Sequence, residues 1–464
     1  MAATESGGIS DTEVRKLGRF VSQANHKVMT HEAREELKKR ILDTIGVAIG
    51  ALEGEPIRMI REHDEDFGGK PLCTFIGGGK SSPDRVGFYN GALSRYLDFM
   101  DSYLAKGETC HQSDNFGAVL AAAEYADSSG DDVLSAMAVA YQVQGRLCDE
   151  APVRAKGFDH TVQGAYASAA GVARALGLDA EKTAMAIAIS GTCNNALRVT
   201  RTGAISHWKG LAYPNTGFVG SHSAFLAFRG ITGPEEVFEG NKGLKEAISG
   251  EFAIDWENED LENVRKSIIK KYNAEIHSQS SIEGALELQA EKGFSWDQIQ
   301  HINIEIFDVA FHIIGGGEEG DKTIIRTKEE ADHSLQYMVG VALIDGNVLP
   351  AQYENDRFLN DDIQQLIQRF TVVPKQEYTD RFPNEVCTRL TFTLQDGTVH
   401  EVMKTDYEGF NTRPMSWQTV EEKFIDLATP FTSKKVRERI VAVVKNLEDS
   451  SARELAHILG NLTE

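Results

Sequence analysis

The stretch YASAAGVARALGL (residues 166–178) decides the expected fold, because small residues recur in it at helical spacing. KTAMAIAISG (residues 182–191) has the same character, and Ala, Gly and other small residues dominate the sequence from residue 117 to residue 230. Small side chains allow helix axes to approach closely. The sequence therefore predicts a compact bundle of helices over this region.

The sequence before this region also predicts helices. Ser10-Asp-Thr-Glu13 has the form of a capping box, in which side chains satisfy free backbone N–H groups at a helix start. Thr30 is expected to cap the next helix, in which Gly46 and Gly50 lie four residues apart and allow close contact with a neighbouring helix. We therefore expect these segments to belong to the helical part of the protein.

After residue 265 the pattern changes to a mixture of helices and strands. Apolar residues alternate in HINIEIF (residues 301–307), and TVVP (residues 371–374) predicts a second short strand. Residues 386–403 predict a β-hairpin that turns at Asp396-Gly397. Helical sequence returns in SKKVRERIVAVVKNL (residues 433–447). A smaller α+β unit is therefore inserted into a helical protein.

This pattern predicts a mainly α protein with two domains. Residues 1–267 and 409–464 would form a large, discontinuous all-helical domain. Residues 268–408 would form the smaller α+β domain, which we call the lid.

Two predicted helices of the lid carry polar residues. Ser280-Ser-Ile-Glu283 has capping-box form and places His277 just ahead of a helix N-terminus, where free N–H groups favour an anion. EEADHSLQYMVGVALIDG (residues 329–346) is predicted to be one helix with His333 and Tyr337 one turn apart on a shared face. Ordinary packing of a helical stripe is the simplest explanation for that pair.

Polar groups are concentrated in DFMDSYLAKGETCHQSDN (residues 98–115), which contains four carboxylates, several hydroxyls, a lysine and a histidine. Apolar helical sequence borders it on both sides, so it is predicted to join two helices. Burying these groups would be costly unless each had a partner, which indicates a site whose ligand completes the hydrogen bonding. A solvated loop between helices is the alternative.

Three further polar junctions separate the predicted helices of the bundle. They are KGFDHT with His160, CNNALRVTRTG with Arg198 and Arg201, and SHWKG with His207 and Lys209. A single His or Lys at a helix end is more often a partner of the helix dipole or a solvated tip than part of a site. Each junction alone is therefore weak evidence for function.

The charge of the chain excludes some classes of partner. It has 48 basic and 70 acidic residues and a formal net charge of −22, which opposes nonspecific binding of nucleic acids and of anionic membranes. An anionic substrate must therefore meet a local cluster of positive groups. The apolar run at residues 45–52 is far shorter than the ~20 residues of a spanning helix. The sequence also shows no signal-peptide pattern at its N-terminus.

The five cysteines are scattered and form no CxxC pair. They are Cys73, Cys110, Cys148, Cys193 and Cys387. This pattern predicts free thiols in a reducing cytoplasm. It provides no spaced set of thiolates for an iron–sulfur cluster or a structural zinc ion.

Several motifs in combination resemble the MmgE/PrpD family of carboxylate lyases, which includes 2-methylcitrate dehydratases and cis-aconitate decarboxylases. The motifs occur in collinear order over nearly the whole chain. They are RILDTIGVAIGALEG (residues 40–54), the YLDFMD and CHQSDN parts of the polar stretch, KGFDHT, SHWKG, HSLQYMVGVALIDG and PMSW (residues 414–417). Any one of them would be weak, but their order makes the resemblance strong.

The resemblance implies a large helical domain, a smaller α+β lid, a homodimer, and catalysis without a metal or an organic cofactor. It also implies a set of site residues, which are Asp98, His111, His160, Lys209, His277 and Tyr337. The first loop resembles the decarboxylases less well. Ser102 stands where they have threonine, and residues 106–110 lengthen the approach to His111. This difference counts against decarboxylation without excluding it.

These residues suggest a mechanism for dehydrating a citrate-like di- or tricarboxylate. Removing a proton α to a carboxylate creates a dianion, which Lys209 and His160, helped by Arg201, would stabilise. His111 and His277 would be base and acid in an order that the sequence leaves open. Asp98 would orient a histidine or bind the leaving hydroxyl. Ser102 and Tyr337 would bind substrate, and closure of the lid would exclude water.

Other functions remain open at this stage. A decarboxylase acting on cis-aconitate needs the same binding groups, and an isomerase of the same family is a smaller possibility. A metal-dependent hydrolase has no support from an HExxH motif or a comparable spacing. A noncatalytic binding or structural protein predicts that changes at the three histidines affect only stability.

Overall fold

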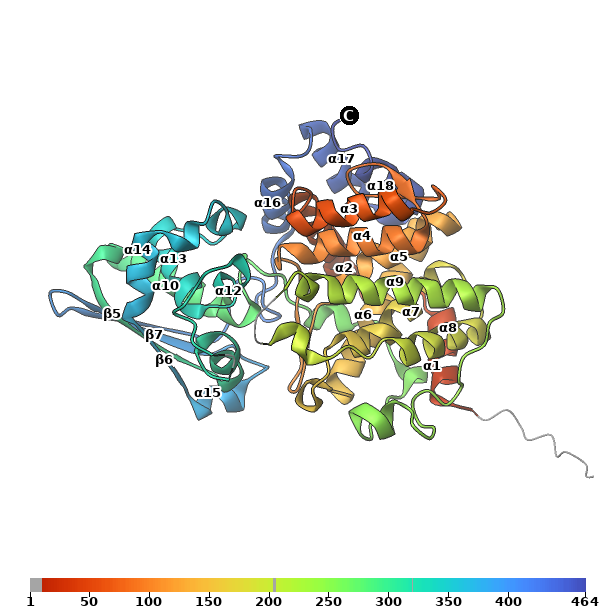
Figure 1. The fold of residues 1–464 in the computed structure, drawn as a ribbon, viewed down its shortest axis with the longest axis horizontal. Coiled ribbons are helices and arrows are strands. Elements are labelled where there is room, and N and C mark those ends of the chain that lie inside the picture. Colours follow the sequence, from red (N-terminus) through yellow and green to blue (C-terminus); the bar gives the residue numbers. More distant parts are fainter. Residues whose placement is uncertain (1–10, 203–205, 319) are drawn as a thin grey trace, which may run out of the picture.

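Two lobes make up the structure, which is a computed structural model describing residues 11–202, 206–318 and 320–464 (Figure 1). Helices dominate it and the sheets are small, which confirms the predicted mainly α class. The helices of the larger lobe are α1 (Glu13–Gln23), α2 (His31–Gly50), α3 (Glu55–Phe67), α4 (Pro83–Tyr96), α5 (Phe116–Ala126), α6 (Gly130–Glu150), α7 (Thr161–Ala175), α8 (Ala180–Cys193), α9 (Trp208–Phe228), α16 (Trp417–Ala428), α17 (Lys434–Lys445) and α18 (Ala452–Leu459).

Small residues bring the helices of this lobe close together, as the sequence predicts. A Cβ atom on Gly117 of α5 would lie 2.4 Å from the backbone nitrogen of Gly91 in α4. A Cβ atom on Gly46 of α2 would lie 3.1 Å from the Cα atom of Phe424 in α16. Larger side chains at these positions would force the helices apart.

The C-terminal helices return to the first lobe, although the lid separates them from it in sequence (Figure 1). α16 packs on α2, and α18 packs on α5. One hydrophobic core accordingly combines residues between Val14 and Ile269 with residues between Met415 and Leu462. A second core lies between Ile268 and Phe410. The predicted domain boundaries remain a proposal, to which these two cores lend support.

The second lobe is built on a four-stranded sheet. Its strands are β5 (Ile299–Ile306), β6 (Phe370–Pro374), β7 (Thr388–Leu394) and β8 (Val399–Lys404), in the order β6-β5-β7-β8. β5 pairs with β6 in parallel and with β7 antiparallel, and β7 and β8 form the predicted hairpin. The helices are α10 (Gln279–Lys292), α11 (Asp308–Ala310), α12 (Lys328–Ala331), α13 (Leu335–Asp345), α14 (Asp361–Leu366) and α15 (Gln376–Arg381).

Short two-stranded ladders fold two loops of the larger lobe. β1 (Cys73–Thr74) pairs with β2 (Lys80–Ser81). β3 (Tyr103–Leu104) pairs with β4 (Thr109–Cys110) within the polar stretch. The stretch also forms an isolated bridge between Ser102 and Ile268, so it is tied to the start of the second lobe.

Two local predictions for the lid were wrong. α10 begins at Gln279, so Ser280 is inside the helix and is not its cap, and Glu283 instead binds Lys404 and Arg413. The predicted single helix at residues 329–346 is broken between α12 and α13. The Ser334 hydroxyl accepts a hydrogen bond from the Tyr337 N–H and starts a new helix. His333 therefore lies in the break and shares no helix face with Tyr337.

At the helix starts near the N-terminus, Thr30 caps α2 through the Ala33 N–H, as predicted. The predicted capping box includes Ser10, which lies outside the described residues.

Each of the five cysteines is a free thiol, as predicted. Within residues 11–202, 206–318 and 320–464, no helix is both long enough and apolar enough to cross a membrane.

Candidate active site

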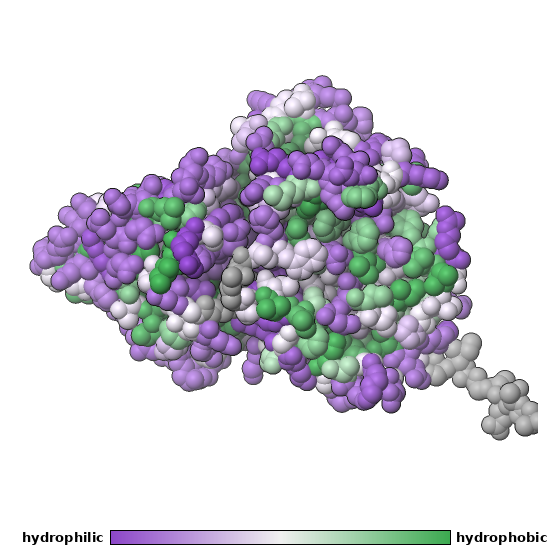
Figure 2. All heavy atoms as spheres, viewed as in Figure 1, coloured by the Kyte–Doolittle hydropathy of each residue, from purple (hydrophilic) through white to green (hydrophobic). Residues whose placement is uncertain are grey.

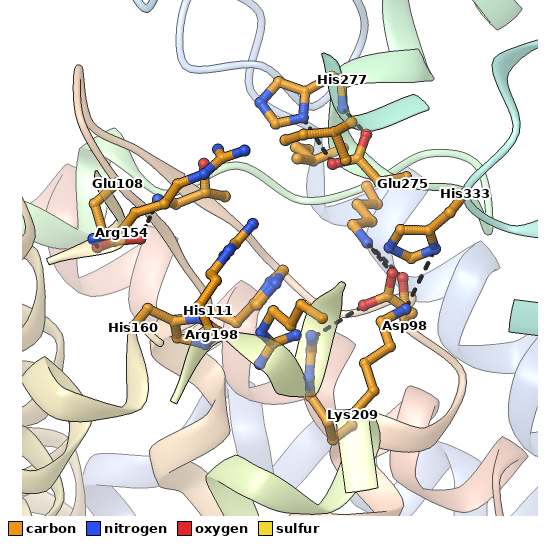
Figure 3. A pocket seen from close by; sticks show the side chains of 16 residues that line it. Asp98, Glu108, His111, Arg154, His160, Arg198, Lys209, Glu275, His277 and His333 are labelled. Atoms are coloured by element: carbon orange, nitrogen blue, oxygen red, sulfur yellow. Dashed lines mark hydrogen bonds and ion pairs between the residues drawn. The ribbon is translucent and has the colours of Figure 1, made fainter. Parts of the chain in front are cut away.

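A polar cavity lies between the two cores and encloses about 610 Å³ that no protein atom fills, part of it open to solvent. Figure 3 shows His111, His160 and Arg198 on one side of it and Glu275, His277 and His333 on the other. The residues that line it are Arg95, Asp98, Glu108, Thr109, His111, Arg154, His160, Arg198, Arg201, Lys209, Lys270, Glu275, Ile276, His277, Ile313 and His333. Both lobes therefore contribute to one cavity.

Most of the polar stretch between α4 and α5 is buried, with Lys106 and Gly107 exposed at its tip, which rules out the alternative of a solvated loop. Asp101 is fully buried, and its Oδ1 accepts hydrogen bonds from the Ser113 N–H and hydroxyl. Its Oδ2 accepts from the Tyr141 and Ser267 hydroxyls. These bonds fix the loop from which Asp98 and His111 reach the cavity.

Asp98 lies directly after α4 with a left-handed backbone, at a φ of 53°. Its carboxylate is 2.9 Å from Arg95 Nη1 and 3.3 Å from Lys270 Nζ. Burial alone would raise the pKa of Asp98, but the charges of Lys270, Lys209 and Arg95 outweigh burial and hold it well below its usual value. Asp98 is therefore ionised and holds cations from both lobes at the cavity.

His111 is held in one tautomer by the backbone. Its Nδ1 is 2.6 Å from the carbonyl oxygen of Asp101 and 3.1 Å from the Ser102 hydroxyl. A carbonyl oxygen only accepts hydrogen bonds, so Nδ1 carries the proton. Burial lowers the pKa of His111 well below 6.5, and the Arg95 and Lys270 charges lower it further. Near pH 7 the ring is neutral, and its unprotonated Nε2 can accept a proton.

His160 lies directly before α7, between two buried carboxylates. Asp159 Oδ1 is 3.3 Å from its Nδ1, and Asp114 Oδ2 is 3.9 Å from its Nε2. Asp159 also binds Arg201. Burial alone would raise the pKa of Asp159, but the charges of Arg201 and His160 outweigh burial and lower it. The His160 ring stacks on the Tyr213 ring, with centroids 5.9 Å apart. Asp159 thus links His160 and Arg201 at the wall of the cavity.

Lys209 reaches the cavity from the first turn of α9. It is 8% exposed, and its Nζ is 3.3 Å from His333 Nδ1 and 3.8 Å from Asp332 Oδ1. Burial lowers the pKa of Lys209, while the carboxylates of Asp332 and Asp98 oppose that effect. A buried amine with nearby carboxylates on both lobes suits the binding of an anionic group.

His277 comes from the lid, in a short turn just ahead of α10. Its Nδ1 is 2.7 Å from Glu275 Oε1, and its backbone N–H donates to the other oxygen of that carboxylate. Burial alone would raise the pKa of Glu275, but the adjacent His277 outweighs burial and the pKa falls to about 2. Glu275 is therefore ionised and fixes a proton on Nδ1. Among the described residues, His277 Nε2 has no hydrogen-bond partner.

The structure places six of the predicted site residues around one cavity. These are Asp98, His111, His160, Arg201, Lys209 and His277. The other two predictions, Ser102 and Tyr337 as substrate-binding residues, are not supported. Ser102 is fully buried behind His111, and the Tyr337 hydroxyl donates to the Gln352 carbonyl inside the lid core. Neither residue is among those that line the cavity in the described part of the chain.

The cavity is rich in cations although the chain is acidic overall. Six Arg and Lys side chains line it, against three carboxylates and four histidines. Over the described residues, no group of three or more His, Cys, Asp or Glu side chains is arranged to hold a metal ion. The donor set therefore suits an anionic organic molecule better than a cation.

Comparison with known proteins agrees with this geometry. Residues 15–257 match the MmgE/PrpD N-terminal domain, and residues 272–449 match the MmgE/PrpD C-terminal domain. The chain belongs to the MmgE/PrpD family. Residues 258–271 lie between the two matched segments. They include Lys270, which lines the cavity.

Relatives of this MmgE/PrpD chain include enzymes with two different names. The chain is 26% identical over 456 residues to the 2-methylcitrate dehydratase of Escherichia coli (strain K12), covering 90% of this chain and 91% of that protein. It is 29% identical over 350 residues to the 2-methylcitrate dehydratase of Cupriavidus necator, covering 70% of each. It is 24% identical over 438 residues to the cis-aconitate decarboxylase of Mus musculus, covering 89% of this chain and 86% of that protein.

Sequence reasoning missed several residues of this MmgE/PrpD site. Arg95 and Lys270 meet Asp98 at the cavity, although Lys270 is 172 positions away in sequence. No local pattern could reveal such a pair. Glu275 stands two positions before His277, and that spacing was a usable signal for a carboxylate–imidazole pair. His333 was noticed but interpreted as part of a packed helical face.

Proposed function

We propose that this protein is a cofactor-independent lyase of the MmgE/PrpD family that dehydrates 2-methylcitrate or a related citrate-like tricarboxylate to the corresponding aconitate. The observation that supports it best is the cavity in which Lys209, His160 and His277 converge from both lobes. Such a tricarboxylate is a polyanion, and six cationic side chains line the cavity. The names of the bacterial relatives agree with this reaction.

The cationic side chains bind the carboxylates of the substrate in this proposal. Lys209, with Arg201 and His160, which line the same cavity, stabilises the charge that develops on the carboxylate next to the reacting carbon. This charge is greatest after proton removal, so the same contacts lower the barrier more than they strengthen substrate binding. Asp98 keeps Arg95 and Lys270 in place around them.

His111 is the base and His277 is the acid in this proposal. His111 presents an unprotonated Nε2 and takes the proton from the carbon α to a carboxylate. The ionised Glu275 stabilises a positive charge on His277, whose Nε2 gives a proton to the leaving hydroxyl. The carbon–oxygen bond then breaks, water leaves, and an alkene forms. One proton is taken and one is given, so the reaction is balanced.

Product analysis tests the proposed function directly. Purified protein is offered 2-methylcitrate, citrate and cis-aconitate separately, and the products are identified by mass spectrometry. We expect one tricarboxylate to lose the mass of water in a reversible reaction. Failure to transform any citrate-like acid, including under the conditions of the reverse reaction, would contradict the proposal.

A decarboxylase is the second candidate function, and the mouse relative of that name favours it. It would use the same cationic side chains to bind cis-aconitate and a histidine to protonate the carbon that loses carbon dioxide, which gives itaconate. Ser102 in place of the threonine of the decarboxylases counts against it, although Ser102 acts on His111 and not on the cavity. Release of carbon dioxide from cis-aconitate would decide for this candidate.

The pH dependence of turnover should reflect His111 and Lys209. Because the pKa of His111 is lowered, the neutral base persists below pH 6.5 and is lost only as the pH falls through the lowered value. Because the pKa of Lys209 is lowered from 10.5, its charge is lost as the pH rises through a value below 10.5. We expect the acid limb of kcat/KM to lie below pH 6.5 once substrate ionisation is subtracted, and Lys209 to stop supporting turnover at a pH below 10.5. An acid limb above pH 6.5 would contradict the role of His111.

We also propose that the protein is a homodimer, as the family resemblance implies. Figure 2 shows hydrophobic side chains on the helical lobe and a more hydrophilic lid. Exposed apolar side chains of the helical lobe include those of Trp208 and Phe228, at the two ends of α9, and of Ile231 just beyond it. Light scattering on the purified protein should give twice the mass of the chain, and the mass of a single chain would contradict this proposal.

A further inference from the structure

Asp332 lies between the two lobes, directly beside Lys209. It follows α12 in the lid and is 1% exposed. Lys328 Nζ is 2.9 Å from its Oδ2, and His333 Nδ1 donates to its Oδ1. Lys209 Nζ, which belongs to the helical lobe, is 3.8 Å from the same Oδ1. One buried carboxylate thus contacts two lysines and a histidine across the boundary between the lobes.

Charges of both signs surround the Lys209 amine. Arg95 comes from α4, Asp98 from the loop after α4, Lys328 from α12, Asp332 and His333 from the loop between α12 and α13, and His207 from the start of α9. Asp98 is already bound by Arg95 and Lys270. Asp332 has other partners too, but its Oδ1 is within ion-pair distance of Lys209 Nζ, at 3.8 Å, so it is the carboxylate that we expect to balance the charge of Lys209.

Lys328 is held firmly next to Asp332. Its Nζ lies over the rings of Tyr96 and Tyr353, at 5.6 and 5.7 Å from their centroids. The pKa of Lys328 is raised, because the charge and hydrogen bond of Asp332 outweigh the opposing effect of burial. Lys328 is thus a permanent cation within reach of the Asp332 carboxylate, and it shares that carboxylate with Lys209.

We propose that Asp332 is a positioning residue of the lid that holds the Lys209 ammonium charged at the cavity, and that Lys328 competes with Lys209 for it. The effect of this arrangement on turnover rests on the proposed function, whereas its effect on the Lys209 amine does not. Docking of the lid supplies Asp332 to Lys209. Without it, Lys209 would face the charges of Arg95 and Lys328, opposed by the carboxylate of Asp98 that Arg95 and Lys270 already share.

This arrangement predicts shifts of opposite sign for two substitutions. Asp332→Asn removes the balancing charge but keeps an oxygen that can accept from His333, so the Lys209 amine should lose its proton at a pH lower by about one unit. Lys328→Met removes a competing cation and frees Asp332 for Lys209. The amine should then lose its proton at a higher pH. Burial lowers the pKa of Lys209, and Asp332 opposes and Lys328 reinforces that effect.

Competitive labelling of the ligand-free protein measures this directly. Acetic anhydride reacts only with neutral amines, and mass spectrometry of the peptide that contains Lys209 gives its labelled fraction at each pH. Asp345→Asn is the matched control. Asp345 is a lid carboxylate that pairs with Arg357 at a distance of 2.8 Å, and neither residue lines the cavity. We expect the midpoint to fall in Asp332→Asn, to rise in Lys328→Met and to stay unchanged in the control.

Equal midpoints in the wild-type protein and both variants would overturn the proposal, as would shifts of the same sign in both. Lys328→Met alone still decides the question if Asp332→Asn does not fold, because an unchanged or lowered midpoint contradicts the competition. Opposite shifts in a protein without lyase activity would contradict only the proposed function.

Discussion

Lys209→Met should lower kcat/KM for the tricarboxylate substrate by about 10³-fold and leave the protein folded. The methionine keeps most of the apolar volume of the lysine but cannot stabilise negative charge on the substrate, and loss of one such group costs about 10² to 10³ in kcat. Asp332 keeps Lys328 and His333 as partners, so the substitution leaves no unpaired buried carboxylate and should cost little stability. Steady-state kinetics and thermal unfolding of the same preparation measure both effects.

Lys38→Met is the matched control for this substitution. Lys38 is also a buried lysine, 5% exposed, but it pairs with Glu35 and Glu448 far from the cavity. The Lys38→Met variant should be less stable than the wild-type protein but retain its turnover. Near-normal turnover in Lys209→Met would remove Lys209 from the mechanism, and equal losses of turnover in both variants would indicate a general effect of removing a buried lysine.

His111→Asn should lower kcat by 10²-fold or more, within the range of about 10² to 10⁴ that a general base contributes. An asparagine amide can still donate to the Asp101 carbonyl, so the loop should keep its position while the base is lost. The clearest measurement is exchange of the substrate α-hydrogen in deuterium oxide, since exchange reports proton removal without the later steps.

His26→Asn is the control for that measurement. His26 is another buried histidine whose pKa burial lowers, and it contacts Ser135 and Asp131 outside the cavity. The His26→Asn variant should exchange the substrate α-hydrogen at the wild-type rate. A His111→Asn enzyme that exchanges the α-hydrogen at the wild-type rate would transfer the role of base to another residue, and a noncatalytic protein would show no exchange in any variant.

Much of the fold could be predicted because it depends on local patterns. Small residues at helical spacing indicated the packing of α5, α7 and α8, and alternating isoleucines indicated β5. The break between α12 and α13 could not be predicted in this way. Apolar residues continue at helical spacing through residues 329–346, and only the contact of the Ser334 hydroxyl with the Tyr337 N–H decides that a new helix begins.

The site was predicted less completely than the fold. The family resemblance pointed to His111, His160, Lys209 and His277, and all four line the cavity. It also pointed to Tyr337, whose hydroxyl is used by a lid carbonyl instead. Lys270 and Asp332 were missed because they pair with Asp98 and Lys209 across the boundary between the lobes, and no spacing in the sequence records such pairs. Arg95 was also missed, although it stands only three positions before Asp98.

The central claim is that groups from both lobes act on one polycarboxylate in the cavity between them. A crystal structure with an unreactive tricarboxylate, such as tricarballylate, tests it most directly. The account predicts carboxylate oxygens within hydrogen-bond distance of Lys209 and His160 from the helical lobe, and His277 from the lid facing the same molecule. A tricarboxylate bound elsewhere, or bound by the residues of one lobe alone, would contradict it.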